Sequence, residues 1–177
     1  MENELKIYHG SVTEMPFDDK LYDGIFCYGL IYLLDENERA KLIQDCFNQL
    51  TDDGYMVFTA ISKDAQTYGQ GTQISKDRFE MFGGVTIFFY DKQSIEEEFG
   101  NVGLFEITEV TENYPFYSIS CGKHKRNLRI RRRTTTRYHQ SFLGVHCTNY
   151  KSAGGGELFL LYLHREAHQM EQANFGL

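Results

Sequence analysis

The feature that most constrains the fold of this chain is a strand, helix and strand in close succession. The run YDGIFCYGLIYLL at 22–34 is almost continuously apolar and aromatic, which is typical of a central strand covered on both faces. A second buried run, YMVFTAIS, occupies 55–62, directly after the turn-forming TDDG at 51–54. A helical pattern separates the two runs. This order predicts a parallel sheet and therefore an α/β fold.

The helix between the two runs has a recognisable start. Asp35 can cap it, with Glu38 three residues later in a capping-box arrangement. Apolar residues at helical spacing then mark the face that we expect to be buried: Ala40, Ile43, Phe47 and Leu50.

The flanking segments extend this pattern in both directions. LKIYHG at 5–10 predicts a short strand ended by glycine, and 63–92 predicts a long excursion over one edge of the sheet. Ser94 and Glu97 suggest a second capping box that opens the helix SIEEEFGNVG. LFEITEV and FYSISCG then predict two final strands that lie side by side in antiparallel order.

Charge divides the 177-residue chain near Gly122. Residues 1–122 carry 8 Lys and Arg against 22 Asp and Glu, whereas residues 123–177 carry 10 against 3. We therefore expect one α/β domain at 1–122 and a basic tail at 123–177. Within this tail, KSAGGGE indicates a flexible glycine stretch, and ELFLLYLHREAHQMEQ favours a terminal helix.

The sequence also predicts a compartment. No stretch reaches the roughly 20 apolar residues that span a bilayer, and the start MENELKIYHG lacks the pattern of a secretory signal. The four cysteines are spread out with no CxxC pair, which argues against a zinc ribbon or a disulfide framework. We expect a cytoplasmic protein without a membrane partner.

Several motifs, in order, resemble the class I S-adenosylmethionine-dependent methyltransferases. GSVTEMPFDDKLYDGIFC resembles the family's segment from the end of its third strand, through "lPF", into its fourth strand. LIYLLDENERAKLIQDCFNQLTDDGYMVFTAI resembles its next helix, turn and fifth strand, and FGNVGLFEITEV its sixth strand. The resemblance covers residues 4 to about 122. It implies a Rossmann-like sheet, S-adenosylmethionine as cofactor and a small-molecule methyl acceptor.

The resemblance also implies a site. Gly10, Ser11 and Val12 would border the adenine, and Cys27 and Tyr28 would lie beside the methionine part or the acceptor. Ser11 stands where many members have Asp, which places a carboxylate contact to the adenine amino group in doubt. The alternative for Cys27 and Tyr28 is that they only close a core strand.

The family's first two strands have no counterpart before residue 4. Their acidic-x-Gly-x-Gly-x-Gly loop and ribose-binding acidic residue are therefore missing from this sequence. The glycines at 154–156 follow no predicted strand and are not counted as a substitute. We expect a sheet that is incomplete, beginning at the third strand, with weak or absent cofactor binding.

Methyl transfer requires positioning and exclusion of water more than a dedicated set of catalytic residues, so none is assigned. His9 is interpreted as an edge residue rather than a base. Aromatic faces can hold a cation such as a sulfonium. The candidates for the acceptor pocket and its lid are Tyr32, Tyr68, Phe82 and Tyr90.

Two further motifs lie in the tail. His164 and His168 are four residues apart, but Arg165 stands where the metalloprotease pattern needs Glu, so a solvated helix face is favoured and no metal is expected. A basic run could bind phosphates; an exposed tail or a counter-charge to the acidic body is favoured over that reading. Its members are Arg129, Arg131, Arg132, Arg133 and Arg137, beside Tyr138.

Two alternative functions remain open. One is a non-catalytic binding or regulatory module that uses the basic tail on nucleic acid or an acidic partner. The other is self-association, in which another chain supplies the missing strands to an exposed sheet edge.

Overall fold

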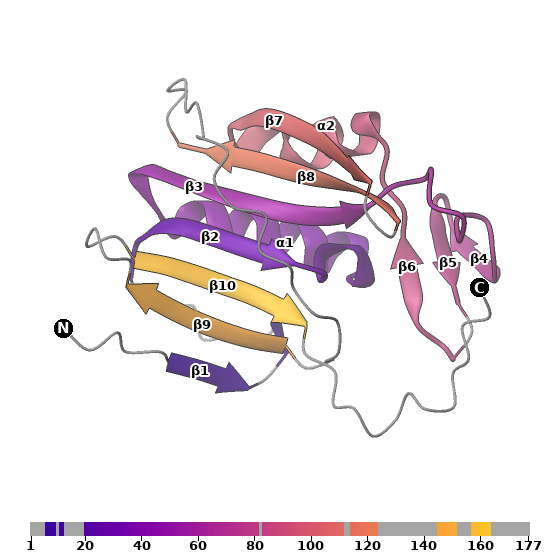
Figure 1. Cartoon of the computed structure of the whole chain (residues 1–177), viewed down its shortest axis with the longest axis horizontal. Helices are drawn as coiled ribbons and strands as arrows, with labels where there is room; N and C mark the ends of the chain where they lie inside the picture. The colour runs from indigo at the N-terminus through magenta and orange to yellow at the C-terminus, as the bar shows by residue number, and fades with distance from the viewer. Residues whose placement is uncertain are drawn as a thin grey trace.

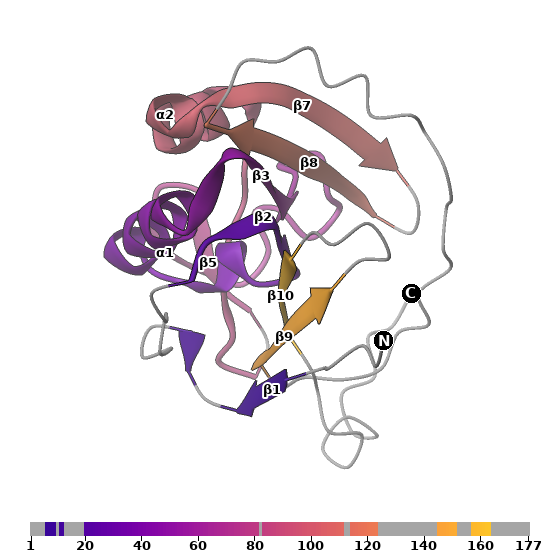
Figure 2. The ribbon, with the colours of Figure 1, turned by 90° about the vertical axis from the view of Figure 1, so that its left-hand side faces the viewer.

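The computed structural model confirms the α/β fold, with a seven-stranded sheet in the order β1-β9-β10-β2-β3-β8-β7 (Figure 1). It describes residues 6–9, 11–12, 20–81, 83–111, 114–123, 145–151 and 157–163. Both helices of the described residues lie on the same face of the sheet (Figure 2). None of the helices in these ranges is long and apolar enough to cross a membrane.

The five strands predicted between residues 4 and 122 all form. The parallel pair at the centre is set by Gly24 opposite Tyr55 and Cys27 opposite Phe58. The last two strands are antiparallel neighbours, as predicted. The five strands are β1 (Lys6–His9), β2 (Tyr22–Tyr28), β3 (Leu50–Ile61), β7 (Leu104–Thr111) and β8 (Pro115–Gly122).

The apolar run at 22–34 is not a single strand. The strand ends at Tyr28, Gly29 takes a φ of 71°, and Ile31–Leu33 form a short 3-10 turn. A positive φ is readily adopted by glycine, so the chain turns out of the sheet at this residue. The apolar composition of 22–34 predicts burial, but it does not predict the position of the turn at Gly29.

Two strands from the tail, β9 (Val145–Lys151) and β10 (Glu157–Leu163), lie between β1 and β2. β10 runs parallel to β2, with Leu158 opposite Gly24, and β9 runs antiparallel to both β10 and β1. The terminal helix expected from residue 157 is therefore wrong over 157–163. A continuous apolar run of this length does not separate strand from helix, and pairing with β2 decides it. The division of the chain at Gly122 into separate units stays a prediction.

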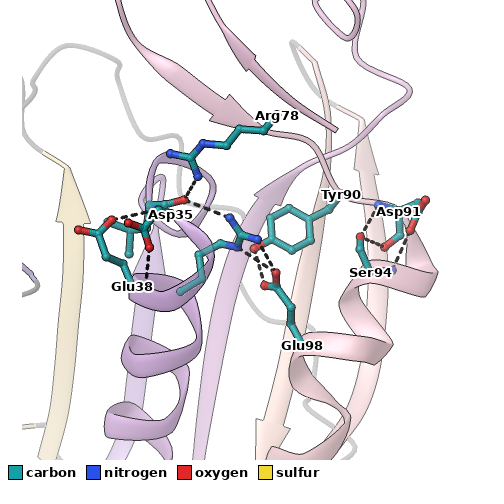
Figure 3. A network of polar contacts seen from close by, with 9 residues as sticks. Asp35, Glu38, Arg78, Tyr90, Asp91, Ser94 and Glu98 are labelled. Carbon is teal, nitrogen blue, oxygen red and sulfur yellow. Dashed lines mark hydrogen bonds and ion pairs between the residues drawn. The ribbon is translucent and has the colours of Figure 1, made fainter. Parts of the chain in front are cut away.

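Helix α1 spans Glu36–Asn48 and has the predicted capping box: Asp35 Oδ1 accepts from Glu38 N, and Glu38 Oε2 accepts from Asp35 N, both at 2.9 Å (Figure 3). The buried face differs from the predicted one, because Ala40 is exposed and Phe47 is only half-buried. The residues that face the core are Arg39, Leu42, Ile43 and Cys46. A buried arginine is invisible to a search for apolar periodicity.

Helix α2 spans Lys92–Phe99 and starts earlier than predicted. Its N-cap is Asp91, whose side chain accepts from Ser94 N at 2.8 Å, while Ser94 Oγ accepts from Asp91 N at 3.0 Å. Ser94 is therefore the third residue of the helix and not its cap, so the predicted pairing of Ser94 with Glu97 is wrong. Both acidic and hydroxyl side chains can act as the N-cap and as its partner three residues later. The sequence alone therefore does not separate the pair Asp91 and Ser94 from the pair Ser94 and Glu97.

The excursion at 63–92 contains a small antiparallel sheet beyond the ends of β2 and β3 (Figure 1). Its strands are β4 (Thr72–Ser75), β5 (Arg78–Glu80) and β6 (Thr86–Phe88). Lys63 Nζ anchors it, lying 2.7 Å from Asp77 Oδ2 and 2.5 Å from Asp91 Oδ2. Asp77 takes a φ of 60° and also accepts from the Tyr68 hydroxyl at 2.7 Å.

A polar network on the helical face joins this excursion to both helices (Figure 3). Glu98 of α2 accepts from Arg39 Nε through Oε1 and from the Tyr90 hydroxyl through Oε2, each at 2.9 Å. Arg39 and Arg78 both donate to the Leu34 carbonyl at the start of α1. These contacts fix the excursion against the edge at which β2 ends.

Candidate functional site

The candidate site is a notch at the carboxyl end of the parallel strands. In an open α/β sheet, this edge is where ligands bind. β8 contributes because it runs antiparallel to β3, which places Phe116 opposite Ile61. The lining residues are Tyr28, Gly29, Tyr32, Thr59, Ala60, Ile61, Tyr114 and Phe116.

The backbone at the base of the notch is fixed by one hydrogen bond. Gly29 N donates to Thr59 Oγ1 at 2.9 Å, which ties the turn after β2 to β3. A Cβ on Gly29 would lie 3.7 Å from the Tyr32 hydroxyl oxygen, so the turn packs closely under that ring. The Gly29 amide is thus engaged within the protein and does not point a donor at a ligand.

Three phenols converge on the notch. Burial raises the pKa of Tyr32 well above its ordinary value, and nearby Tyr114 and Tyr28 raise it further. Burial also raises the pKa of Tyr114, with Tyr28 as a further cause. Near neutral pH, Tyr32 and Tyr114 are uncharged hydroxyls and not bases.

The notch is shallow and has an open rim. The volume of the notch is about 20 Å³, which is room for about one water. The rings of Tyr28 and Tyr114 remain 45% and 42% exposed at its rim. No Lys, Arg, Asp or Glu is among the residues that line it. A group larger than water must therefore lie over the exposed rings at the mouth.

The predicted cofactor residues are divided between two places. Tyr28 lines the notch, whereas the Cys27 side chain is fully buried in the core. Val12 is buried against α1, at a separate hollow of about 160 Å³, and Ser11 is exposed. Gly10 lies outside the described residues. Contact of these residues with a cofactor stays a prediction.

The predicted acceptor-pocket residues do not gather at one point. Tyr32 lines the notch. Tyr68 packs edge-on against Phe79 and Phe89 in the excursion, with its hydroxyl on Asp77. Tyr90 is fully buried, and its hydroxyl donates to Glu98. Phe82 lies outside the described residues.

β10 is the neighbour of β2 on the side away from β3, and in the sequence it is followed by no glycine-rich segment of the kind that the methyltransferase resemblance implies. β10 ends at Leu163, on the notch side of the sheet, and His164, Arg165 and Glu166 follow it in sequence. β9 ends at the opposite edge, where Lys151 pairs with Glu157 beside the start of β2. In sequence, the glycines at 154–156 follow β9, contrary to expectation, and they lie outside the described residues.

The remaining sequence motifs lie largely outside the described residues. This holds for His164 and His168, for the basic run from Arg129 to Arg137 and for Tyr138. His9 lies on β1, at the edge of the sheet, and nothing is described of its side chain. Within the described ranges, no group of three or more His, Cys, Asp or Glu side chains is placed to hold a metal ion.

Sequence reasoning did not select Gly29, Thr59, Tyr114 or Phe116. A signal existed for the first two, because they sit at or near the carboxyl ends of two strands that were predicted to be parallel neighbours. Tyr114 and Phe116 required knowledge that the start of β8 reaches the end of β3. That register depends on pairing across the whole excursion and is not encoded locally.

Comparison with known proteins gives a family match for part of the chain. Residues 1–58 match the family model of a methyltransferase domain. No curated protein matches the chain.

Solved structures extend the likeness to the fold. A SAM-dependent methyltransferase from Methanosarcina mazei is 12% identical, with a TM-score of 0.51 over 64% of this chain and 65% of that one. The 1,6-didemethyltoxoflavin-N1-methyltransferase of Burkholderia thailandensis, solved with 1,6-didemethyltoxoflavin and S-adenosylhomocysteine, is 12% identical, with a TM-score of 0.49. That match covers 62% of this chain and 47% of the other. The chain thus spans about half to two thirds of the length of these proteins.

Proposed function

We propose that this chain transfers a methyl group from S-adenosylmethionine to a small-molecule acceptor. The proposal is supported by the match of residues 1–58 to the model of a methyltransferase domain and by the similarity of the fold to that of a solved SAM-dependent methyltransferase. The observation that carries the proposal is the notch at the ends of β2 and β3, lined by Tyr28, Gly29 and Thr59. We propose further that the activity is impaired in this chain and that the protein is cytoplasmic.

The described residues fit one half of this cofactor. Uncharged, aromatic side chains of Tyr28, Tyr32 and Tyr114 suit the methyl-bearing sulfonium end, because an aromatic face attracts a cation. The sequence that follows β10, from His164 on, contains no glycine-rich motif of the kind that holds the adenosine end in open α/β sheets. Because the described residues suit only one end of S-adenosylmethionine, the cofactor would be held weakly. This is the reason for proposing that methyl transfer by this chain is impaired.

The role of this chain's own residues is positioning. The hydrogen bond from Gly29 N to Thr59 Oγ1 holds the turn after β2 in one conformation. The raised pKa values of Tyr32 and Tyr114 mean that both hydroxyls are neutral near pH 7, so they can donate hydrogen bonds but do not act as bases. When bound, S-adenosylmethionine supplies the methyl group, and the rings limit the approach of water.

The test is a titration of the purified chain with S-adenosylmethionine, followed by calorimetry and by NMR. We expect no heat at micromolar ligand and a saturable NMR shift at Tyr28 to Tyr32 in the millimolar range, displaced by S-adenosylhomocysteine. Micromolar affinity would contradict the impairment. Absence of any shift at millimolar ligand would contradict cofactor binding and with it the proposed function.

One variant and one control show whether the binding takes place at the notch. Tyr28→Leu should weaken the millimolar binding, because it removes a ring from the notch. Phe105→Leu replaces an exposed ring on β7, away from the notch, and should leave binding unchanged. The role of the basic run on nucleic acid and the self-association of the chain stay predictions.

A further inference from the structure

We propose that Arg78 of β5 is a positioning residue of the notch, acting on it from the excursion at 63–92 through the carbonyl of Leu34. The turn between β2 and α1 brings Tyr32 to the notch, and Leu34 is the last residue of that turn. The inference rests on the proposed function for the ligand that the notch would bind, and it adds how the geometry of the site is set. The contacts of Arg78 themselves do not depend on a ligand.

The turn between β2 and α1 is weakly hydrogen-bonded within itself. Leu33 N donates to the Leu30 carbonyl at 3.0 Å. Leu34 N donates to the Ile31 carbonyl at 3.4 Å, which is longer than a usual backbone hydrogen bond. A 3-10 turn also has poorer hydrogen-bond geometry than an α-helix. The orientation of this turn therefore depends on the contacts made at its two ends.

The two ends are held by side chains from different parts of the chain. At the first end, Gly29 N donates to Thr59 Oγ1 of β3 at 2.9 Å. At the second end, the Leu34 carbonyl accepts from Arg39 of α1 and from Arg78 of β5 (Figure 3). A carbonyl oxygen has two lone pairs, so it can accept from both guanidinium groups. Arg78 thus connects the excursion directly to the turn.

The two arginines differ in what else they hold. Arg39 is 4% exposed, and its guanidinium lies over the Phe88 ring. Arg78 is half-buried, and its backbone is fixed because it pairs with Phe88 and because its neighbour Phe79 is buried on the other face of β5. Loss of Arg78 would leave the Leu34 carbonyl bonded to Arg39, so no buried acceptor would lose its last donor. We therefore expect this loss to affect the turn more than the stability of the fold.

Ile61 gives the excursion a second contact with the notch. It lines the notch and also packs against the apolar cluster of the excursion, formed by Ala65, Phe79 and Phe89. The excursion therefore reaches the notch through β3 as well as through the turn after β2. Because coupling between two sites is reciprocal, a ligand that orders the notch should also stabilise the excursion.

The test is amide hydrogen exchange in the full chain without ligand, measured at Leu33, whose amide donates within the turn. We expect Arg78→Leu to speed exchange at this amide by about threefold or more, while amides of β3 are unchanged. Arg78→Lys restores a cationic donor and should recover most of the protection. Lys76→Leu removes an exposed cation from the same excursion and is the matched control.

Two results of this experiment would overturn the proposal. One is unchanged exchange at Leu33 in Arg78→Leu. The other is a uniform rise in exchange across the sheet, with a matching loss in thermal unfolding temperature, because Arg78 would then contribute only to the stability of the fold.

A binding measurement connects the effect to the proposed function. In the NMR titration, S-adenosylmethionine should bind Arg78→Leu about threefold more weakly than the parent chain, with Lys76→Leu unchanged. Unchanged binding in a variant whose turn exchanges faster would overturn the role of Arg78 at the notch. If the parent chain does not bind S-adenosylmethionine, the proposed function fails, whereas exchange at Leu33 still decides whether Arg78 positions the turn.

Discussion

Arg39 on α1 and Glu98 on α2 form an ion pair with 2.8 Å between Arg39 Nη2 and Glu98 Oε1. The Arg39 side chain is only 5% exposed, and its guanidinium lies 4.0 Å from the centroid of the Phe88 ring. It also donates to the Leu34 carbonyl at 3.1 Å. One cation thus joins the two helices, β6 and the turn that leads from the notch into α1.

Arg39→Leu is expected to lower the free energy of unfolding by about 3 kcal/mol, because Glu98 would be left without its cationic partner. Urea denaturation followed by circular dichroism measures the change. Lys41→Leu is the matched control, since its ion pair with Asp45 is on the same helix but 60% exposed at the lysine. That control should change stability by less than about 0.5 kcal/mol. Equal effects of the two variants would contradict the structural role of Arg39.

Gly103→Ala is expected to be severely destabilising, by about 3 kcal/mol or more, because two costs combine. Gly103 has a φ of 71°, and an added Cβ would lie 2.1 Å from the Gly122 carbonyl oxygen. Gly69→Ala separates these costs, because Gly69 has a φ of 80° with nothing within 4 Å of the added atom. It should cost only about 1 kcal/mol from backbone strain. Thermal unfolding of both variants measures which of them is the more destabilised. A Gly69→Ala variant that is destabilised as much as Gly103→Ala would contradict the role of the contact with Gly122.

Because the pKa of Asp91 is lowered in the folded state, we expect the free energy of unfolding to fall at acid pH. Its hydrogen bond with Lys63 and the capping bond from Ser94 N lower its folded-state pKa from 3.8 to about 2. The stabilisation is therefore fully present above the ordinary pKa and is lost as the pH falls towards 2. Because the side chain is 42% exposed, solvent screening limits the effect to about 1 kcal/mol.

Asp91→Asn tests this dependence. The amide oxygen can still cap α2 but carries no charge, so helix α2 should form as before. We expect the difference in stability between the parent chain and the variant to shrink as the pH falls from 5 to 2. A difference that stays constant over this range would mean that the charge on Asp91 does not contribute.

Removal of the β9–β10 pair is expected to open the sheet. A chain ending at Lys123 lacks the strand that pairs with β2 and the strand that pairs with β1. Amides at Ile25 to Cys27 should then exchange faster with solvent, and light scattering should show association through the open edge. A chain ending at Leu163 retains both strands and is the control. Identical exchange in the two chains would show that β10 contributes little to the sheet.

The local signals in the sequence predicted the elements well where one mechanism dominated. The cap formed by Asp35 and Glu38 and the strands at the centre of the sheet follow from short-range chemistry. The buried face of α1 was missed because a charged residue, Arg39, occupies it and is satisfied by partners distant in sequence. A search for apolar residues at helical spacing does not identify a buried residue that is charged.

Long-range pairing determined what the sequence did not predict. ELFLLYL becomes a strand because β2 offers it a parallel partner, and only the assembled sheet provides that partner. The notch also depends on residues that are distant in sequence. Tyr28 is predicted as a site residue from its place at the end of a strand, but Tyr114 follows the excursion and joins it only in the folded chain. The family resemblance pointed to residues at the end of β2 without specifying which rings line the notch there, and their contact with a cofactor stays a prediction.

The pairing of β1 with β9 has a consequence for how the protein is made. Among the described strands, the one partner of β1 is a segment that begins at Val145, more than a hundred residues further along the chain. A nascent chain therefore carries Lys6–His9 without a partner through the synthesis of more than a hundred residues, since domains acquire their contacts as the ribosome releases them. During that interval the backbone edge of β1 is open to other partners.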